Sequence, residues 1–564
     1  MKAFADLYAR LDASTSNNAK LGALEDYFRG APPADAAWAV YFLCGGKPRQ
    51  LVPTKLLREL IAQTSALPQW LFDECYQAVG DLAETLSLLL PSSETDASQG
   101  LATWVEEKLL PLRGIQPEEI TTRLLPLLVQ LDRRSQLVCV KLITGSFRVG
   151  VSKLLVTRAL ASLAGLDAKT VAQRLVGYTD VSARPSAANF ERLIASSAAG
   201  AVETHDAGTP YPFYLAHSLQ TPVEEFASQL GSPDRWQIEW KWDGIRAQVV
   251  KRQGQLWIWS RGEELVTDRF PELQALAQPL PDGTVLDGEI VVWRNDQLQP
   301  FAALQQRIGR KKLSTSLLNQ VPVVFLAYDL LEWQALDWRE RPQWERRRQL
   351  EELMNRHPHP QWRLSEQLQG ADWIDLERQR SRSRALGVEG MMLKEKDSTY
   401  GVGRTKEGGV WWKWKIDPYS VDAVLVYAQR GHGRRASLYT DFTFAVWDAG
   451  PDESERKLVP FAKAYSGLTD EEMRQVDAVI RKTTIEKFGP VRTVTPTLVF
   501  EIGFEGIALS SRHKSGIAVR FPRILRQRAD KPIAEADTLG TLRALLPSTS
   551  APPSVRPSET PELW

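Results

Sequence analysis

Apolar residues recur every three or four positions through the first third of the chain. Pro117–Leu131 and Lys153–Leu163 show this spacing clearly, and it places apolar side chains on one face of a helix. Alternating runs of Val and Ile are scarce before residue 195, and clusters such as Leu90–Glu94 (LPSSE) punctuate the pattern. The pattern therefore predicts an all-α region over residues 1 to about 195.

The pattern changes after residues 195–212, which are small and polar and contain Pro and Gly, as linkers do. Beyond them, strand-like apolar runs alternate with helical stretches up to about Lys415. The predicted strands are Trp236–Val250, Leu256–Ser260, Thr284–Trp293 and Val321–Leu331, and the predicted helices are Pro342–Asn355 and Ala371–Leu386. This mixture predicts an α+β domain.

From Asp417 onward the apolar runs are short. The strands predicted there are Val421–Tyr427, Ala436–Trp447, Leu458–Tyr465 and Thr497–Phe504. Many short strands favour a small β-barrel. The Pro- and Ser-rich residues 546–564 predict a disordered tail. We therefore expect a multi-domain protein with all-α, α+β and β-barrel parts, in that order.

The composition is that of a globular protein with several domains, since the chain has 564 residues, 43% hydrophobic and 25% charged. Its net charge is only +1, so any nucleic-acid surface must come from local clusters of Lys and Arg. Cys44, Cys75 and Cys139 form no CxxC pair, which argues against a disulfide framework or a zinc site and favours a reducing cytoplasm. The N-terminus is too polar for a signal peptide, and no apolar run is long enough to span a membrane.

The first candidate for chemistry is the sequence from Lys241 to Arg246 (KWDGIR), which lies in a strand-like run. A deprotonated lysine is a nucleophile, Gly244 permits a tight backbone path beside a ligand, and Arg246 can pair with phosphate or ribose. By itself the sequence also fits an exposed strand of alternating charge. Its KxDGxR pattern resembles the lysine nucleotidyltransferase superfamily of ATP-dependent DNA ligases, RNA ligases and mRNA capping enzymes. The resemblance implies that Lys241 forms a covalent lysyl-nucleotide.

Further segments that resemble motifs of this superfamily follow in the family's order. They are Ser260–Gly262 (SRG), Leu286–Glu289 (LDGE), Phe301–Arg310 (FAALQQRIGR), Ala327–Leu330 (AYDL), Val388–Lys394 (VEGMMLK) and Trp411–Lys415 (WWKWK). Each alone could be an ordinary turn or core strand. Their order between Lys241 and Lys415 makes independent chance agreement negligible.

The resemblance implies roles for individual residues. Lys241 is the implied nucleophile, and Asp243 is implied to orient either Lys241 or a water molecule on the metal. The residues implied to contact ATP in this part of the chain are Glu239, Lys241, Arg246, Arg261, Glu289, Tyr328, Arg404, Lys413 and Lys415. Lys406 competes with Arg404 for its role.

Strand alternation refines two of these roles. It places Lys413 and Lys415 on one face, so that both ammonium groups can face one triphosphate. The resemblance implies that Tyr328 stacks on adenine, where many family members have Phe. It also implies that Glu289 and Glu389 bind Mg²⁺.

A basic segment near the C-terminus favours a DNA ligase within the superfamily. Arg520–Lys531 (RFPRILRQRADK) resembles the terminal motif of the OB-fold domain of DNA ligases. In that family the segment moves onto the triphosphate, which implies phosphate contacts for Arg526, Arg528 and Lys531. Taken alone, the segment could be a solvated basic strand.

A second segment points to DNA binding. Leu142–Ser152 (LITGSFRVGVS) resembles the G-x-x-R-x-G segment of the N-terminal DNA-binding domain of larger cellular ligases. Gly145 and Gly150 would allow close approach to the duplex, and Arg148 would meet phosphate. The alternative is a turn between helices with ordinary glycine caps.

The chain is thus identified as a member of the ATP-dependent DNA ligases, similar to stand-alone bacterial enzymes with an N-terminal DNA-binding domain. The resemblance implies a helical DNA-binding domain over residues 1–200, an adenylation domain over 210–416, an OB-fold domain over 417–540 and a tail over 546–564, with a hinge near Lys415–Ser420. It implies that the enzyme seals nicked double-stranded DNA with ATP and Mg²⁺. It also implies a cytoplasmic, nucleoid-associated monomer that inserts in no membrane. Repair nucleases or helicases would be separate partners.

Two other functions stay open at this point. One is a different enzyme of the superfamily, an RNA ligase or an mRNA-capping-type guanylyltransferase. The other is an inactive DNA-binding scaffold, against which the presence of Lys241, Glu289 and Glu389 argues.

Overall fold

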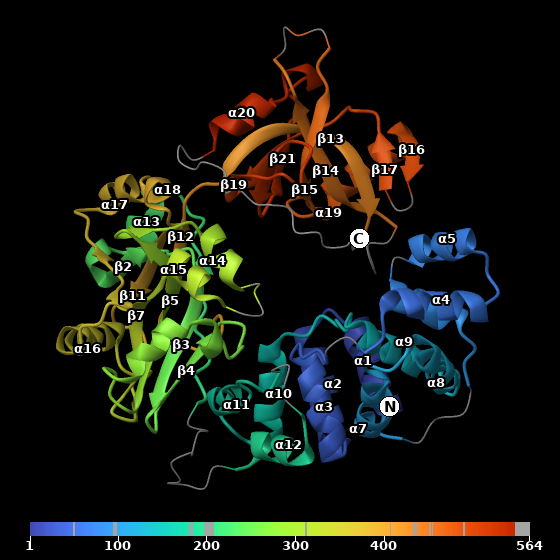
Figure 1. Cartoon of the computed structure of the whole chain (residues 1–564), viewed down its shortest axis with the longest axis horizontal. Coiled ribbons are helices and arrows are strands. Elements are labelled where there is room, and N and C mark those ends of the chain that lie inside the picture. The colour runs from blue at the N-terminus through green and yellow to red at the C-terminus, as the bar shows by residue number, and fades with distance from the viewer. Residues whose placement is uncertain are drawn as a thin grey trace. The chain divides into compact units, whose positions relative to one another are not determined.

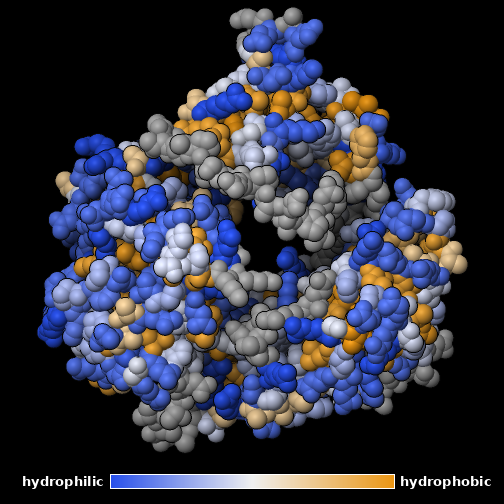
Figure 2. Space-filling model, viewed as in Figure 1, coloured by the Kyte–Doolittle hydropathy of each residue, from blue (hydrophilic) through white to orange (hydrophobic). Residues whose placement is uncertain are grey.

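The computed structural model describes residues 1–48, 51–79, 81–93, 99–179, 184–196, 208–308, 310, 313–406, 408–431, 437–450, 453, 455–488 and 491–546 (Figure 1). Contacts divide the chain into two compact units, Met1–Pro53 with Ser92–Ile416 and Thr54–Pro91 with Asp417–Trp564. Residues 197–207 of the predicted linker, residues 547–564 of the predicted tail and Ala436 lie outside the described residues. On the side drawn in Figure 2, hydrophilic residues cover most of the surface and hydrophobic residues form smaller patches.

The regular secondary structure of the described residues up to 196 is entirely helical, which confirms the predicted fold class of this region. In the first unit the helices are α1 (Lys2–Ala13), α2 (Asn17–Gly30), α3 (Pro33–Leu43), α7 (Leu101–Thr103, continued by a π-helical turn over Trp104–Leu109), α8 (Pro117–Val129), α9 (Arg133–Thr144), α10 (Lys153–Ala164), α11 (Ala168–Arg174) and α12 (Ala187–Ile194). The second unit contains α4 (Thr54–Thr64), α5 (Gln69–Val79) and α6 (Leu82–Leu89).

Side chains at the helix ends explain where these helices begin and end. Asp132 and Ser152 accept hydrogen bonds from the backbone N–H groups of the first turns of α9 and α10. Gly145 and Gly165 end the same two helices in the left-handed conformation. The two helices predicted most clearly, over Pro117–Leu131 and Lys153–Leu163, are confirmed as α8 and α10.

The α+β part of the first unit contains two sheets. The first has the order β1-β12-β11-β2-β10 and the second the order β4-β3-β5-β7-β8, with β6 on β5 and β9 on β7. Their strands are β1 (His217–Ser218), β2 (Trp236–Trp240), β3 (Ile245–Arg252), β4 (Gln255–Ser260), β5 (Thr284–Arg294), β6 (Gln297–Leu298), β7 (Val323–Trp333), β8 (Leu336–Asp337), β9 (Trp362–Leu364), β10 (Gln367–Leu368), β11 (Gly390–Glu395) and β12 (Trp411–Lys415). The helices are α13 (Phe226–Leu230), α14 (Phe301–Ile308), α15 (Thr315–Gln320), α16 (Gln343–Arg356), α17 (Trp373–Arg380) and α18 (Ser383–Leu386).

Two predictions about this region are wrong in detail. The run Trp236–Val250 is not one strand, because β2 belongs to the first sheet and β3 to the second. Both halves are apolar and alternate similarly, so the pattern alone does not mark the change of sheet. The predicted helix Ala371–Leu386 is likewise two helices, α17 and α18, with Ser381 and Arg382 between them.

Separate apolar cores stabilise the two sheets. Helices α13 and α17 cover the first sheet through Phe226 and Trp373, which pack near Trp414. The second sheet has its own core, which includes Leu350 of α16. A smaller cluster that contains Tyr400 joins residues of both sheets, so side chains from the two sheets can meet.

The C-terminal part of the second unit is an OB-like sheet domain. Its main sheet has the order β15-β14-β13-β17-β16, and β18 pairs with both β13 and β21. The strands are β13 (Tyr419–Arg430), β14 (Tyr439–Trp447), β15 (Leu458–Ala464), β16 (Thr484–Phe488), β17 (Val491–Val494), β18 (Val499–Phe504), β19 (Gly506–Leu509), β20 (Ile517–Arg520) and β21 (Arg523–Gln527), and the helices are α19 (Asp470–Thr483) and α20 (Leu539–Ala544). The predicted strands of this region are thus confirmed within a few residues wherever they are described. Within the described chain, no helix combines the length and apolar character needed to cross a bilayer.

Candidate active site

Lys241 lies directly after β2, where the chain leaves the first sheet for the second. Its backbone N–H donates to Gly390 O at 2.8 Å, and its carbonyl accepts from Glu389 N at 2.8 Å. Its ammonium group forms an ion pair with the Glu389 carboxylate, and Lys415 Nζ lies 3.8 Å from the same carboxylate. The Lys241 side chain keeps 21% of its surface exposed, so a substrate can reach it.

Several cations gather near Lys241. Burial, followed by the neighbouring charges of Lys415, Arg404, Lys241 and Arg261, lowers the pKa of the Lys413 ammonium group. The predicted cations from three separate segments therefore face one region, although Arg261 and Arg404 are exposed. Lys406 instead lies over the ring of Trp412, with Nζ 5.2 Å from the ring centroid. Such a concentration of positive charge favours a polyphosphate ligand.

The second sheet contributes Arg246 and Glu289 to the same region. Arg246 forms a bidentate ion pair with the buried Asp287, with Nη2–Oδ2 at 2.7 Å and Nε–Oδ1 at 3.2 Å. The Tyr400 hydroxyl donates to the same carboxylate at 2.6 Å. Burial raises the pKa of the Glu289 carboxyl to about 8, against the opposing effects of Lys241 and Arg246.

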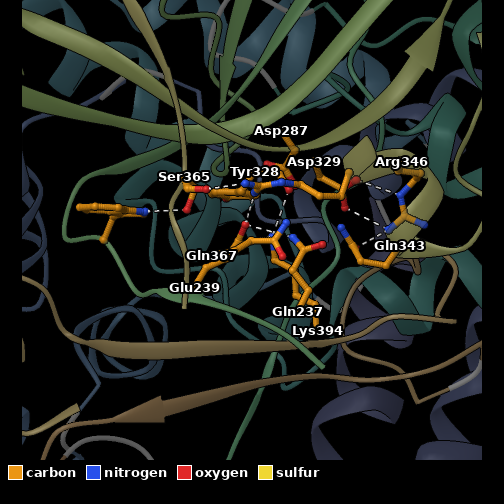
Figure 3. Close-up of polar contacts among 12 residues, drawn as sticks. Gln237, Glu239, Asp287, Tyr328, Asp329, Gln343, Arg346, Ser365, Gln367 and Lys394 are labelled. Carbon is orange, nitrogen blue, oxygen red and sulfur yellow. Dashed lines mark hydrogen bonds and ion pairs between the residues drawn. The ribbon is translucent and has the colours of Figure 1, made fainter. Parts of the chain in front are cut away.

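Tyr328 and Glu239 belong to a buried polar network (Figure 3). Lys394 Nζ lies 4.1 Å from the Tyr328 ring centroid and 2.7 Å from Glu239 Oε2. Arg347 Nη1 lies 2.6 Å from the other oxygen of Glu239. Sequence reasoning assigned no role to Lys394 or Arg347, although a charged residue inside the apolar run of β11 is a signal that could have identified Lys394.

Two carboxylates next to Lys241 could hold a divalent cation. Glu289 lies on β5 of the second sheet and Glu389 directly before β11 of the first, and the charge of Glu389 helps to raise the pKa of Glu289. The described residues contain no group of three or more His, Cys, Asp or Glu suited to a metal. Mg²⁺ commonly takes one or two carboxylates and completes its shell with phosphate oxygens and water, so this pair fits Mg²⁺ that arrives with a nucleotide.

The space around position 244 admits only a glycine. A Cβ there would lie 2.4 Å from Ile290 O and 2.9 Å from Glu289 Cγ, closer than real Cβ contacts come. Asp243, beside it, is partly buried in the same connection between the sheets. The glycine lets the start of β3 approach β5, where Ile245 pairs with Ile290.

Gly244→Ala is therefore expected to lower the rate of any reaction at Lys241 by at least about tenfold, because displacement of a reacting group by an ångström can cost about a hundredfold. Gly22→Ala, with nothing within 4 Å of the added Cβ, is the matched control. Rates of the covalent nucleotide transfer in the purified variants would test this. An unchanged rate in Gly244→Ala would refute the steric argument.

The other predicted phosphate-binding cations belong to the second unit and have partners there. Arg526 pairs with Glu501 at 2.7 Å, and both Arg528 and Lys531 pair with Asp422, at 2.8 and 2.7 Å. These three cations therefore lie along one edge of the OB-like domain, which is formed by β21 and the residues that follow it.

The predicted DNA-contacting loop lies between α9 and α10. Gly145 and Gly150 both have positive φ, 65° and 61°, and Arg148 is exposed. Gly145 is thus a helix cap as well as a loop residue. Lys20 of α2 is buried and donates to Gly150 O at 2.7 Å, which fixes the loop against the helices.

Comparison with known proteins agrees with this arrangement. The family described as "ATP dependent DNA ligase domain" matches residues 214–415, "DNA ligase N terminus" matches residues 1–161, and "ATP dependent DNA ligase C terminal region" matches residues 435–531. A "Probable DNA ligase" of Koribacter versatilis (strain Ellin345) is 31% identical over 96% of this chain and 95% of its own, and a DNA ligase of Thermococcus fumicolans is 27% identical over 96% and 97%. The solved structure titled "Pmar-Lig_PreS3" covers 93% of this chain and 99% of its own at 16% identity with a TM-score of 0.58, which shows the fold alone. The chain therefore belongs to the family of ATP-dependent DNA ligases, the enzymes that seal nicks in DNA.

Proposed function

We propose that this ligase joins the 3′-hydroxyl and 5′-phosphate of nicked duplex DNA, with Lys241 as the residue that carries AMP. The observation that carries the proposal is the position of Lys241 beside Glu389, Lys415 and the cations around Lys413. Such a site combines a nucleophile with charges that stabilise a phosphoryl transition state.

In the first step, the deprotonated amine of Lys241 attacks the α-phosphorus of ATP. An N–P bond forms and the nitrogen loses a proton to solvent, while the bond from the α-phosphorus to the bridging oxygen breaks and pyrophosphate leaves with the electron pair. Lys413 and Lys415 would stabilise the charge that grows on the phosphates. Asp243 would orient Lys241, and we assign the contested ATP contact to Arg404 because its charge acts on Lys413, whereas Lys406 lies over Trp412.

The nucleoside would be held by residues of both sheets. Tyr328 would stack on adenine, and Glu239 would act on the base edge from its buried network with Lys394. Arg246, held by Asp287, and Arg261 would bind ribose and phosphate. Glu289 and Glu389 would hold Mg²⁺, which neutralises phosphate charge when bound.

The next two steps transfer the activated phosphate. The 5′-phosphate of the nick attacks the AMP phosphorus and releases Lys241, which gives DNA-adenylate. The 3′-hydroxyl then attacks the 5′-phosphorus, the phosphodiester forms and AMP leaves. Gly145, Arg148 and Gly150 would contact the duplex backbone during these steps, supported by the exposure of Arg148.

The wider setting is proposed from the resemblance to stand-alone bacterial ligases. On that basis the enzyme acts as a monomer in the cytoplasm, on nucleoid DNA, and relies on separate nucleases or helicases to prepare nicks. Arg526, Arg528 and Lys531 would contact the leaving pyrophosphate during the first step.

Incubation with α-labelled ATP or GTP and Mg²⁺, read on a denaturing gel, tests the proposal. We expect label from ATP alone, discharge of the label by nicked duplex DNA, and a joined strand of full length. Label from GTP would favour a capping-type enzyme, discharge only by nicked RNA would favour an RNA ligase, and protein freed of bound AMP that takes no label would favour an inactive scaffold.

A further inference from the structure

One carboxylate in the OB-like domain binds two of the cations assigned to the leaving pyrophosphate. Asp422 Oδ2, on β13, accepts from Arg528 Nη1 at 2.8 Å and from Lys531 Nζ at 2.7 Å. Only 10% of the Asp422 side chain is exposed. No sequence motif had drawn attention to Asp422, because it is separated from this pair by about a hundred residues of sequence.

The backbone holds Asp422 in place from two directions. Its strand pairs with β18, where Asp422 lies opposite Glu501, and β18 pairs in turn with β21. Asp422 N donates to Asp537 Oδ2 at 2.7 Å, and Asp537 N donates to Asp422 O at 2.8 Å. The carboxylate is therefore a rigid point, whereas Arg528 and Lys531 have long side chains that would otherwise sample many rotamers.

The contacts orient the cations without using all their donors. Arg528 donates hydrogen bonds from Nε and Nη2 to Asp530, at 2.9 and 2.7 Å, and one from Nη1 to Asp422. A guanidinium has five N–H donors and an ammonium group has three. Arg528 and Lys531 therefore both keep N–H donors that are not bonded to Asp422. These donors could form hydrogen bonds to phosphate oxygens.

We infer that Asp422 is a positioning residue for the first step of ligation. It fixes Arg528 and Lys531 in the arrangement that receives pyrophosphate as the bond from the α-phosphorus to the bridging oxygen breaks and Lys241 gains AMP. The inference rests on the proposed function, in which these cations act on the leaving group. Because they act only while pyrophosphate forms, Asp422 matters for enzyme adenylation and not for sealing of DNA-adenylate.

Asp422→Asn separates the two steps. In single-turnover adenylation with labelled ATP, we expect the limiting rate to fall about 10- to 100-fold, as for a displaced catalytic contact. The ATP concentration for half-maximal rate should stay within about twofold, because most of the proposed nucleotide contacts belong to the first unit. Sealing of a nick that already carries AMP should also stay within about twofold. Asp422→Glu, which keeps the charge, should recover part of the lost adenylation rate.

Asp477→Asn is the matched control. Asp477 is buried in the same domain, pairs with Arg481 at 2.6 Å and accepts from Tyr439 N at 3.0 Å, away from Arg528 and Lys531. It should lose comparable stability and keep its adenylation rate. An unchanged rate in Asp422→Asn, an equal loss of adenylation and of sealing, or the same loss in Asp477→Asn would overturn the inference. A wild-type enzyme that forms no lysyl-AMP would overturn the proposed function itself.

Discussion

Lys241→Ala is expected to lower the formation of covalent enzyme-AMP by at least about 10⁴-fold, because removal of a nucleophile removes the covalent route. We do not expect Lys413 or Lys415 to substitute, because the proposed function assigns both to the phosphates of ATP. The measurement is label transfer from α-labelled ATP to the purified protein. The variant should still seal a nick that already carries AMP, in part, because that step forms no bond to Lys241.

Two comparisons make the result decisive. Lys55→Ala removes a lysine whose side chain is 88% exposed and should label like the wild type. If Lys241→Ala labels normally, the nucleophile is another residue. If it fails on DNA-adenylate as completely as on ATP, loss of folding rather than of the nucleophile explains the result.

Asp329→Ala is expected to destabilise the adenylation region by about 3–5 kcal/mol, the cost of leaving a buried charge without its partner. Asp329 and Arg346 have fully buried side chains and pair at 2.8 and 3.0 Å. Arg346 also donates to Gln343 Oε1 at 2.6 Å, but an amide oxygen cannot neutralise its charge. The expected result is a lower urea midpoint and faster hydrogen exchange in peptides from β7 and α16.

The exposed pair between Arg10 and Asp26 provides the control, since both side chains are more than half exposed. Asp26→Ala should leave the urea midpoint unchanged, because solvent screens exposed ion pairs. A double replacement, Asp329→Leu with Arg346→Met, should recover part of the stability lost in Asp329→Ala. A midpoint for Asp329→Ala equal to that of Asp26→Ala would show that the buried pair contributes nothing.

Two neighbouring residues of one motif have different surroundings in the structure. In the segment AYDL, Tyr328 faces the region of Lys394 and Arg246, whereas Asp329 turns to Arg346 on α16. The pairing of β7 with β5 shifts register between Ala327 and Asp329, so Tyr328 lies at an irregularity of the strand, and the two neighbouring side chains meet different partners. Replacement of Tyr328 should therefore lower activity and leave stability largely intact. Replacement of Asp329 should lower stability and leave activity largely intact.

The sequence alone was sufficient for the fold class and the family. Local periodicity reports which face of each helix or strand is buried, so α8, α10 and most strands were predictable. The ordered motifs between Lys241 and Lys415 identified the chemistry through their resemblance to the motifs of the lysine nucleotidyltransferase superfamily. Their assigned roles stay predictions until the variants are measured.

Only the tertiary structure decided which distant residues meet. The change of sheet between β2 and β3, the steric need for Gly244, and the ion pairs of Glu239 and Asp422 all depend on partners far away in sequence. Buried charges are stable only beside partners, and the partner is chosen by strand pairing and packing rather than by local pattern. The sequence by itself therefore determined what kind of enzyme this is, and the fold determined which carboxylates hold its cations in place.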